Sequence, residues 1–103
     1  MYRVFGCFGG AASDTILAAM MKAASDGANV ISMSFGELSG DNPFQQVVES
    51  LGQKGIAIFA ANGNDGNLGT FNPSSPGKEP SVFAVGSIMN EKFPLTYEVR
   101  RRP

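Results

Sequence analysis

The chain has 103 residues, enough for one small domain, and its 8 basic and 9 acidic side chains leave a formal net charge of −1. That balance gives no electrostatic basis for binding nucleic acid or an anionic membrane, and no apolar stretch reaches the roughly 18 residues of a membrane span. Histidine is absent and Cys7 is the single cysteine, so an internal disulfide and a cysteine-based metal site are excluded. We expect no metal or other cofactor.

The first part of the chain predicts a strand followed by a helix. An apolar run at 2–5 indicates the strand. A helix is predicted over 14–26, because Ser13 is a good N-cap and apolar side chains then recur at helical spacing. Gly27 follows at the place where a left-handed cap is favoured.

The middle of the chain predicts two strands around a second helix. The run at 29–34 is mostly apolar. Asn42 and Pro43 form a helix start signal, and apolar side chains then recur at i, i+3, i+4 and i+7 until Gly55. A continuous apolar run at 56–61 is typical of a buried strand in a parallel sheet.

A long loop and one more strand complete the pattern. The loop at 62–80 is rich in Asn, Gly, Ser and Pro, and residues 81–88 read as a strand. The alternating order predicts an α/β fold with a partial parallel sheet of about four strands and two helices on one face.

The second face of such a sheet would be bare. Parallel sheets are normally covered on both faces. Several hundred Å² of missing apolar burial, at about 25 cal/mol per Å², is on the order of 10 kcal/mol, comparable to the whole stability of a domain. We therefore expect this face to be covered by the remainder of a larger domain or by self-association.

Ligands of open α/β sheets bind beyond the carboxyl ends of the strands. Two segments fall there, 34–36 and 61–66, and both contain glycine, which permits close backbone approach. From the residues alone, ordinary turns remain the commoner interpretation. Phosphate binding is disfavoured, because the Asn- and Gly-rich stretch at 62–69 is followed by a Pro-rich loop and not by a helix start.

Three stretches resemble the subtilase family of serine proteases, and they occur in that family's order. They are 26–36 (DGANVISMSFG), 55–66 (GIAIFAANGNDG) and 76–86 (PGKEPSVFAVG). The resemblance implies a partial subtilase catalytic domain over 1–90, part of a three-layer fold, and an irregular tail over 91–103.

The resemblance also implies roles for individual residues. Asn64 corresponds to the asparagine whose amide donates to the oxyanion of the tetrahedral intermediate. A further set corresponds to the walls that pair with the peptide substrate and shape its first specificity pocket. These expected substrate-binding residues are Ser34, Phe35, Gly36, Gly63, Gly9 and Gly10.

The sequence departs from the family in ways that bear on catalysis. The family's triad runs Asp, His, Ser in sequence order, and the resemblance places the first two before this segment and the serine after it. Without histidine, no serine here has the usual base. Asn62 stands where the family usually has a small residue, and Phe35 stands where the family commonly has the less bulky leucine.

The sequence therefore predicts part of a subtilisin-like serine endopeptidase that is catalytically incomplete by itself. Its partners would be a peptide or protein substrate in the complete enzyme and the remainder of the protease domain. The alternative is a non-catalytic, subtilase-derived module that binds peptides or self-associates. Residues 1–6 do not resemble a secretion signal, whereas the family is usually secreted, so localisation is not predicted.

Overall fold

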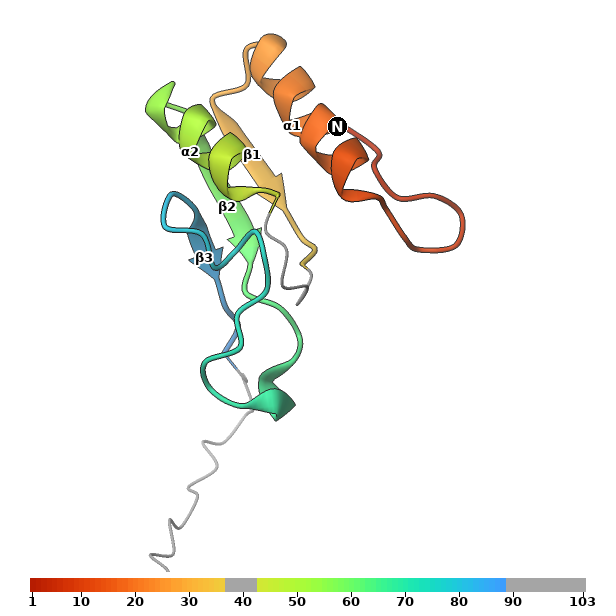
Figure 1. Cartoon of the computed structure of the whole chain (residues 1–103), viewed down its shortest axis with the longest axis vertical. Coiled ribbons are helices and arrows are strands. Elements are labelled where there is room, and N and C mark those ends of the chain that lie inside the picture. The colour runs from red at the N-terminus through yellow and green to blue at the C-terminus, as the bar shows by residue number, and fades with distance from the viewer. Residues whose placement is uncertain (37–42, 89–103) are drawn as a thin grey trace, which may run out of the picture.

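The computed structural model describes residues 1–36 and 43–88 and contains two α-helices and three strands (Figure 1). In sequence order the elements are α1 (Ser13–Ser25), β1 (Val30–Met33), α2 (Gln45–Gln53), β2 (Ala57–Ala61), the short 3-10 helix η1 (Gly66–Leu68) and β3 (Phe83–Val85). The α/β class and the helix predicted at 14–26 are confirmed. The predicted cap Asn42 and the tail at 91–103 lie outside the described residues.

The three strands form one parallel sheet in the order β1-β2-β3. Ile31 pairs with Ile58, and Phe59 pairs with Phe83. Because side chains alternate between the two faces of a strand, this register puts Ile31 and Ile58 on one face and Phe59 and Phe83 on the other.

The core lies between the sheet and both helices, so the two helices cover the same face, as predicted. Ile58 is fully buried in the central strand, and Val48 of α2 is 1% exposed. The buried apolar cluster draws on α1, β1, α2 and β2. Its members are Ile16, Met20, Ala23, Ile31, Met33, Phe44, Val48, Leu51, Ile58 and Ala60.

The second face of the sheet is apolar and uncovered in the part of the protein that the structure describes. Val30, Phe83 and Val85 are 53–60% exposed, and Phe59 is 36% exposed. The rings of Phe59 and Phe83 stack with their centroids 4.9 Å apart and their planes 18° apart. The two aromatic side chains therefore shield each other from water on a face that neither helix reaches.

The strand predicted at 2–5 is absent, so the described sheet has three strands and not about four. Residues 1–6 instead line a cavity of about 1040 Å³ together with α1 and β1. Contacts made by side chains hold this segment: the Tyr2 hydroxyl donates to Asp26, and the Phe5 ring meets Phe35 edge to face. Among the described residues no backbone hydrogen bond joins residues 1–6 to β1, so the segment adds no strand to the sheet.

Two other boundaries differ from the prediction. Pro43 and Phe44 form a turn, and α2 begins at Gln45, because Phe44 is buried in the core while its carbonyl accepts the Val48 N–H at 2.9 Å. The last strand has three residues, because a turn in which the Val82 N–H donates to Glu79 directly precedes it. Among residues 1–36 and 43–88 no helix is long and apolar enough to cross a membrane.

Candidate functional site

The carboxyl edge of the sheet brings two loop segments together. Met33, the last residue of β1, pairs with Ala60 of β2. Since the strands are parallel, residues 34–36 and 62–64 leave the sheet side by side. The segments that sequence reasoning assigned to one site are therefore neighbours in space.

Ser74 lies where these two segments meet. A Cβ added to Gly36 would come within 2.0 Å of the Ser74 Oγ, and a Cβ added to Gly63 would come within 2.8 Å of the same atom. Gly63 also has φ +99°, which disfavours any side chain. Ser74 is 2% exposed, and its hydroxyl has no hydrogen-bond partner among the described residues. Both glycines are thus required by close approach to one buried side chain.

Backbone hydrogen bonds fix the start of the loop that follows β2. The Asn62 N–H donates to the Val85 carbonyl at 3.0 Å, and the Ser74 N–H donates to the Asn62 carbonyl at 3.1 Å. Residue 62 is therefore held on one side by β3 and on the other by the end of its own loop. A Cβ on Gly77 would lie 2.5 Å from the Ala61 carbonyl oxygen, so a second glycine contact presses this loop against β2.

A buried turn supports Ser74 from below. Residues 74–77 and Glu79 are all buried, and the Ser75–Pro76 peptide bond is cis. The Ser75 hydroxyl donates to the Glu79 carboxylate at 3.1 Å, and the Lys78 N–H donates to the Ser74 carbonyl at 3.0 Å. Ser74 is therefore held both by hydrogen bonds within this turn and by its bond to Asn62 at the edge of the sheet.

Asn64 is exposed at the tip of this edge. It lies two residues before η1, where the Leu68 N–H donates to the Asp65 carbonyl at 2.9 Å and the Asn72 amide donates to the Leu68 carbonyl at 2.7 Å. Those bonds order the loop beyond Asn64. Within the described parts of the protein the Asn64 amide has no partner of its own, so its two N–H donors are available to a ligand.

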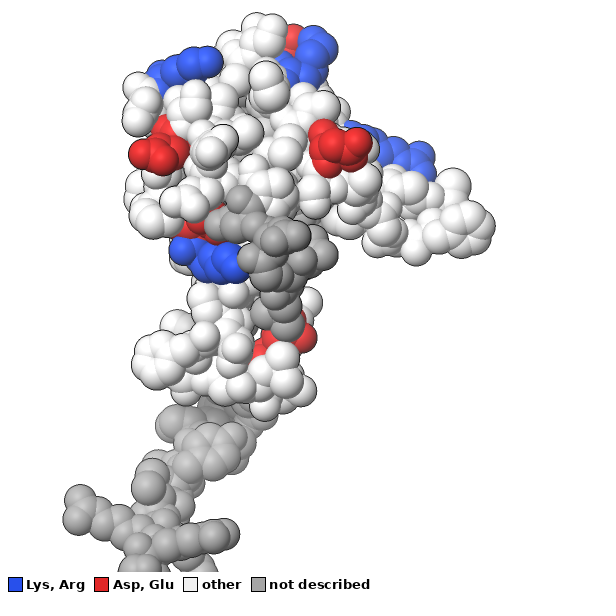
Figure 2. Space-filling model, in the orientation of Figure 1, with Lys and Arg blue, Asp and Glu red and all other residues white. Residues whose placement is uncertain are grey.

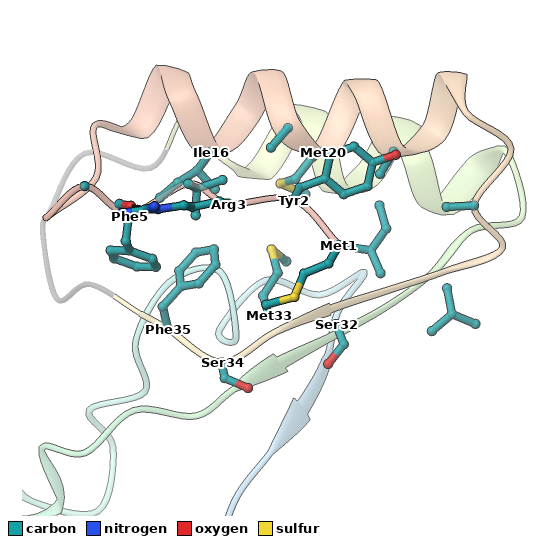
Figure 3. A pocket seen from close by; sticks show the side chains of 17 residues that line it. Met1, Tyr2, Arg3, Phe5, Ile16, Met20, Ser32, Met33, Ser34 and Phe35 are labelled. Carbon is teal, nitrogen blue, oxygen red and sulfur yellow. Dashed lines mark hydrogen bonds between the residues drawn. The ribbon is translucent and has the colours of Figure 1, made fainter. Parts of the chain in front are cut away.

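Ser34 and Phe35 point in different directions from the end of β1 (Figure 3). Phe35 is half-buried and faces Phe5, with ring centroids 5.4 Å apart and planes at 74°. Ser34 is exposed and points away from α1. Phe35 therefore packs toward the cavity beside α1, while Ser34 and Gly36 are exposed at the edge.

Gly9 and Gly10 lie in a separate turn before α1. The Gly6 N–H donates to the Gly10 carbonyl at 3.2 Å, and Gly9 has φ +79°. This turn projects away from the sheet beside α1 (Figure 1). The structure thus joins Ser34, Gly36, Gly63 and Asn64 at one edge and leaves the two glycines of the turn apart from them.

The charges of the visible face are scattered between broad uncharged areas (Figure 2). Shifted pKa values occur at the end of α1, away from the carboxyl edge. Hydrogen bonds from Lys22 and Tyr2 lower the pKa of Asp26, and the bond to Asp26 raises the pKa of both donors. The described residues contain no group of three or more Asp, Glu, Cys or His side chains that would hold a metal ion.

Sequence reasoning missed Ser74 and the anchoring of Asn62. Both depend on contacts between residues more than ten positions apart. The only local signals were the two prolines and the glycine of the 73–77 stretch, which mark a turn without indicating what the turn contacts. The sequence indicated that Gly36 and Gly63 permit close backbone approach, but it did not indicate that both contact Ser74.

The fold is an open parallel α/β unit, and the carboxyl edge of its sheet carries two closely packed glycines and the exposed Asn64. A family model described as "Subtilase family" matches residues 1–98. The chain is 34% identical to subtilisin DY of Bacillus licheniformis over 91 residues, which cover 87% of this chain and 33% of that protein. Subtilisin E of Bacillus subtilis (strain 168) is 39% identical over 67 residues, covering 64% of this chain and 18% of that protein.

The minor extracellular protease Vpr of the same strain is 32% identical over 89 residues, which cover 84% of this chain and 11% of that protein. The chain belongs to the subtilase family, as its motifs indicated. It spans a third or less of the length of these relatives.

Proposed function

We propose that this chain supplies the oxyanion donor and one wall of the substrate cleft of a subtilisin-like serine endopeptidase. The observation that carries the proposal is the convergence of Gly36 and Gly63 on Ser74, with the uncommitted amide of Asn64 directly beside them. Family membership and the names of the relatives support the reaction class, which is hydrolysis of peptide bonds.

Asn64 would donate a hydrogen bond to the negative oxygen that forms when the scissile carbonyl is attacked. A donor that is already fixed in place stabilises the transition state without reorganising during the reaction. The bonds from Asn62 to Val85 and Ser74 hold the loop base, and those around η1 hold its far side. This anchoring on both sides supports Asn64 in such a role.

Residues 34–36 would hold the substrate backbone. Among the described residues their N–H and C=O groups make no backbone hydrogen bond, and they continue the exposed edge of β1. An extended peptide adds to such an edge by main-chain hydrogen bonds. Gly36 is exposed and carries no side chain, so a substrate backbone could approach the chain closely there.

The acid–base machinery would come from elsewhere. The sequence has no histidine, so none of its serines can be activated by the usual imidazole base. In a complete enzyme the Asp, His and Ser would be contributed by other segments. By itself the chain would be catalytically incomplete.

Grafting tests this proposal. Residues 1–88 would replace the corresponding segment of subtilisin DY, and hydrolysis of a peptide ester would be followed for the graft and for the isolated chain. We expect turnover from the folded graft and none above buffer from the chain alone. Turnover by the repurified chain, or a folded graft that binds a peptide-like inhibitor without turning over substrate, contradicts the proposal.

A self-associating, non-catalytic module is the second candidate. The uncovered sheet face with Val30, Phe59, Phe83 and Val85 favours it, because an apolar face of this kind commonly marks an interface. Sedimentation velocity distinguishes the two functions. A discrete, folded dimer that Phe83→Ser dissociates supports the module, whereas a concentration-independent monomer or non-specific aggregation opposes it.

A further inference from the structure

We propose that Asn62 is a site of spontaneous deamidation and isoaspartate formation at the base of the loop that follows β2. Asn62 is the only asparagine in the sequence that is followed by glycine. Asparagine is among the thermally labile residues of proteins, and a following glycine removes the side chain that would block attack. The proposal rests on the sequence and the fold and is independent of the proposed function.

The chemistry needs only water. The Gly63 nitrogen attacks the carbonyl carbon of the Asn62 amide group, and a new carbon–nitrogen bond closes a five-membered succinimide. The bond from that carbon to the amide nitrogen of Asn62 breaks, and ammonia leaves with the proton from Gly63. Water then opens the ring at either of its two carbonyls. Opening at the former amide carbonyl gives aspartate, and opening at the backbone carbonyl gives isoaspartate, whose backbone runs through the former side chain.

The structure leaves the attacking group free. Asn62 and Gly63 are both exposed, so the amide carbonyl and water can meet. In the described parts of the protein the Gly63 N–H donates no hydrogen bond, whereas the N–H and carbonyl of Asn62 are both bonded. The nucleophile is therefore not held back by a bond that must break first.

Isoaspartate would disrupt the anchor of the loop. It lengthens the backbone at residue 62 by one carbon. The Asn62 N–H bonds Val85 at 3.0 Å, and its carbonyl accepts the Ser74 N–H at 3.1 Å. In isoaspartate the carbonyl that accepts the Ser74 N–H leaves the backbone and becomes a free carboxylate, while the chain continues through the former side chain. The Ser74 N–H then no longer bonds a backbone carbonyl that the loop holds in place. An aspartate at the same position preserves the backbone and both bonds.

The first experiment follows the purified protein of residues 1–103 in mildly alkaline native buffer. Trypsin cleavage after Lys54 and Lys78 yields one peptide that contains Asn62 and three other asparagines. Fragment-ion mass spectrometry locates each amide-to-acid exchange, and isoaspartyl methyltransferase detects the isomer. We expect conversion at Asn62, faster at higher pH, with Asn64 and Asn67 unchanged. Conversion only in denaturant, or equally at Asn64, overturns the proposal.

The second experiment separates the effect of the altered isoaspartate backbone from the effect of the added negative charge. Hydrogen exchange at the Ser74 amide should be faster in aged protein than in fresh protein, and unchanged in fresh Asn62→Asp, which carries the charge on a normal backbone. Asn62→Ser should not age. Gly63→Ala is unsuitable as a control, because its φ of +99° and its contact with Ser74 would disturb the loop. Equal exchange in aged and fresh protein contradicts the structural consequence.

Discussion

A methyl group on Gly36 would lie 2.0 Å from the Oγ of Ser74 and 2.7 Å from its Cβ, although 38 positions separate the two residues in the sequence. No side chain tolerates a contact of that length. The end of β1 and the loop beyond β2 are thus fitted to each other through one buried serine. This fit sets the spacing of the two segments that form the candidate cleft.

Gly36→Ala is expected to lower the free energy of unfolding by about 1–3 kcal/mol, since the added methyl overpacks the contact with Ser74. Combining it with Ser74→Gly should recover part of the loss. Gly10→Ala is the matched control, because a Cβ there would meet nothing within 4 Å. Urea denaturation measures all of these variants. A Gly36→Ala variant as stable as Gly10→Ala would show that the fit is loose.

Ser74 and Ser75 are adjacent and similarly buried, but their hydroxyl groups differ in hydrogen bonding. Ser75 donates to Glu79 at 3.1 Å, so Ser75→Ala leaves a buried carboxylate short of a donor and should cost about 1–3 kcal/mol. The Ser74 hydroxyl has no partner among the described residues, so Ser74→Ala should be neutral or slightly stabilising. Thermal unfolding of both variants checks the contrast, and the reverse order would refute it.

Ile58 and Phe59 are consecutive residues of β2 on opposite faces. Ile58→Ala empties a fully buried position and should cost about 2–5 kcal/mol. Phe59→Ala should cost less in the monomer, because Phe59 lies on the uncovered face and chiefly contacts Phe83. Denaturation at low protein concentration tests the difference. Equal losses would mean that the second face is buried in solution.

The pKa of Asp26 should depend on the two side chains that donate hydrogen bonds to its carboxylate. Lys22 and Tyr2 lower its pKa below the ordinary value. The stabilisation from its charged form is therefore present above the pKa of the unfolded state and is lost as the pH falls through the lowered folded pKa. Lys22→Met should raise the pKa of Asp26 in an NMR titration of the carboxyl carbon, and Lys54→Met should not. An unchanged titration would show that the ion pair does not persist in solution.

The hydrogen bond of Tyr2 should be lost at high pH, whereas the stabilisation from ionised Asp26 is lost at low pH. Its pKa is raised because its hydroxyl donates to Asp26. The contribution of this bond is complete below the pKa of tyrosine in the unfolded state and is lost as the pH rises through the raised folded pKa. The Tyr2 bond ties the first residues of the protein to the end of α1, so high pH should release that segment.

Local signals in the sequence predict most of the elements and the sheet edge at which the candidate site is proposed. Apolar spacing indicated α1 to within one residue at each end, although the N-cap is Ala12 and not the predicted Ser13, and apolar runs located β1 and β2. The resemblance of three motifs indicated the family that the comparisons show. These features depend on residues that are close together in the sequence.

Features that depend on distant contacts were not predictable. Residues 2–5 have the composition of a strand, but the structure shows side-chain contacts of Tyr2 with Asp26 and of Phe5 with Phe35. Among the described residues no backbone hydrogen bond joins this segment to β1. The same limit applies to Ser74, whose meeting with Gly36 and Gly63 depends on the register of β1 against β2.

The most direct test of the account is the turnover number of the subtilisin DY graft with and without Asn64→Ala. Asn67→Ala is the control, because Asn67 is an exposed asparagine of the same loop. We predict a loss of about 10² to 10³ in kcat with little change in KM, the range known for removing the asparagine donor of subtilisin and not one derived from this structure. A kcat for Asn64→Ala equal to that of Asn67→Ala would contradict the assignment of the oxyanion donor.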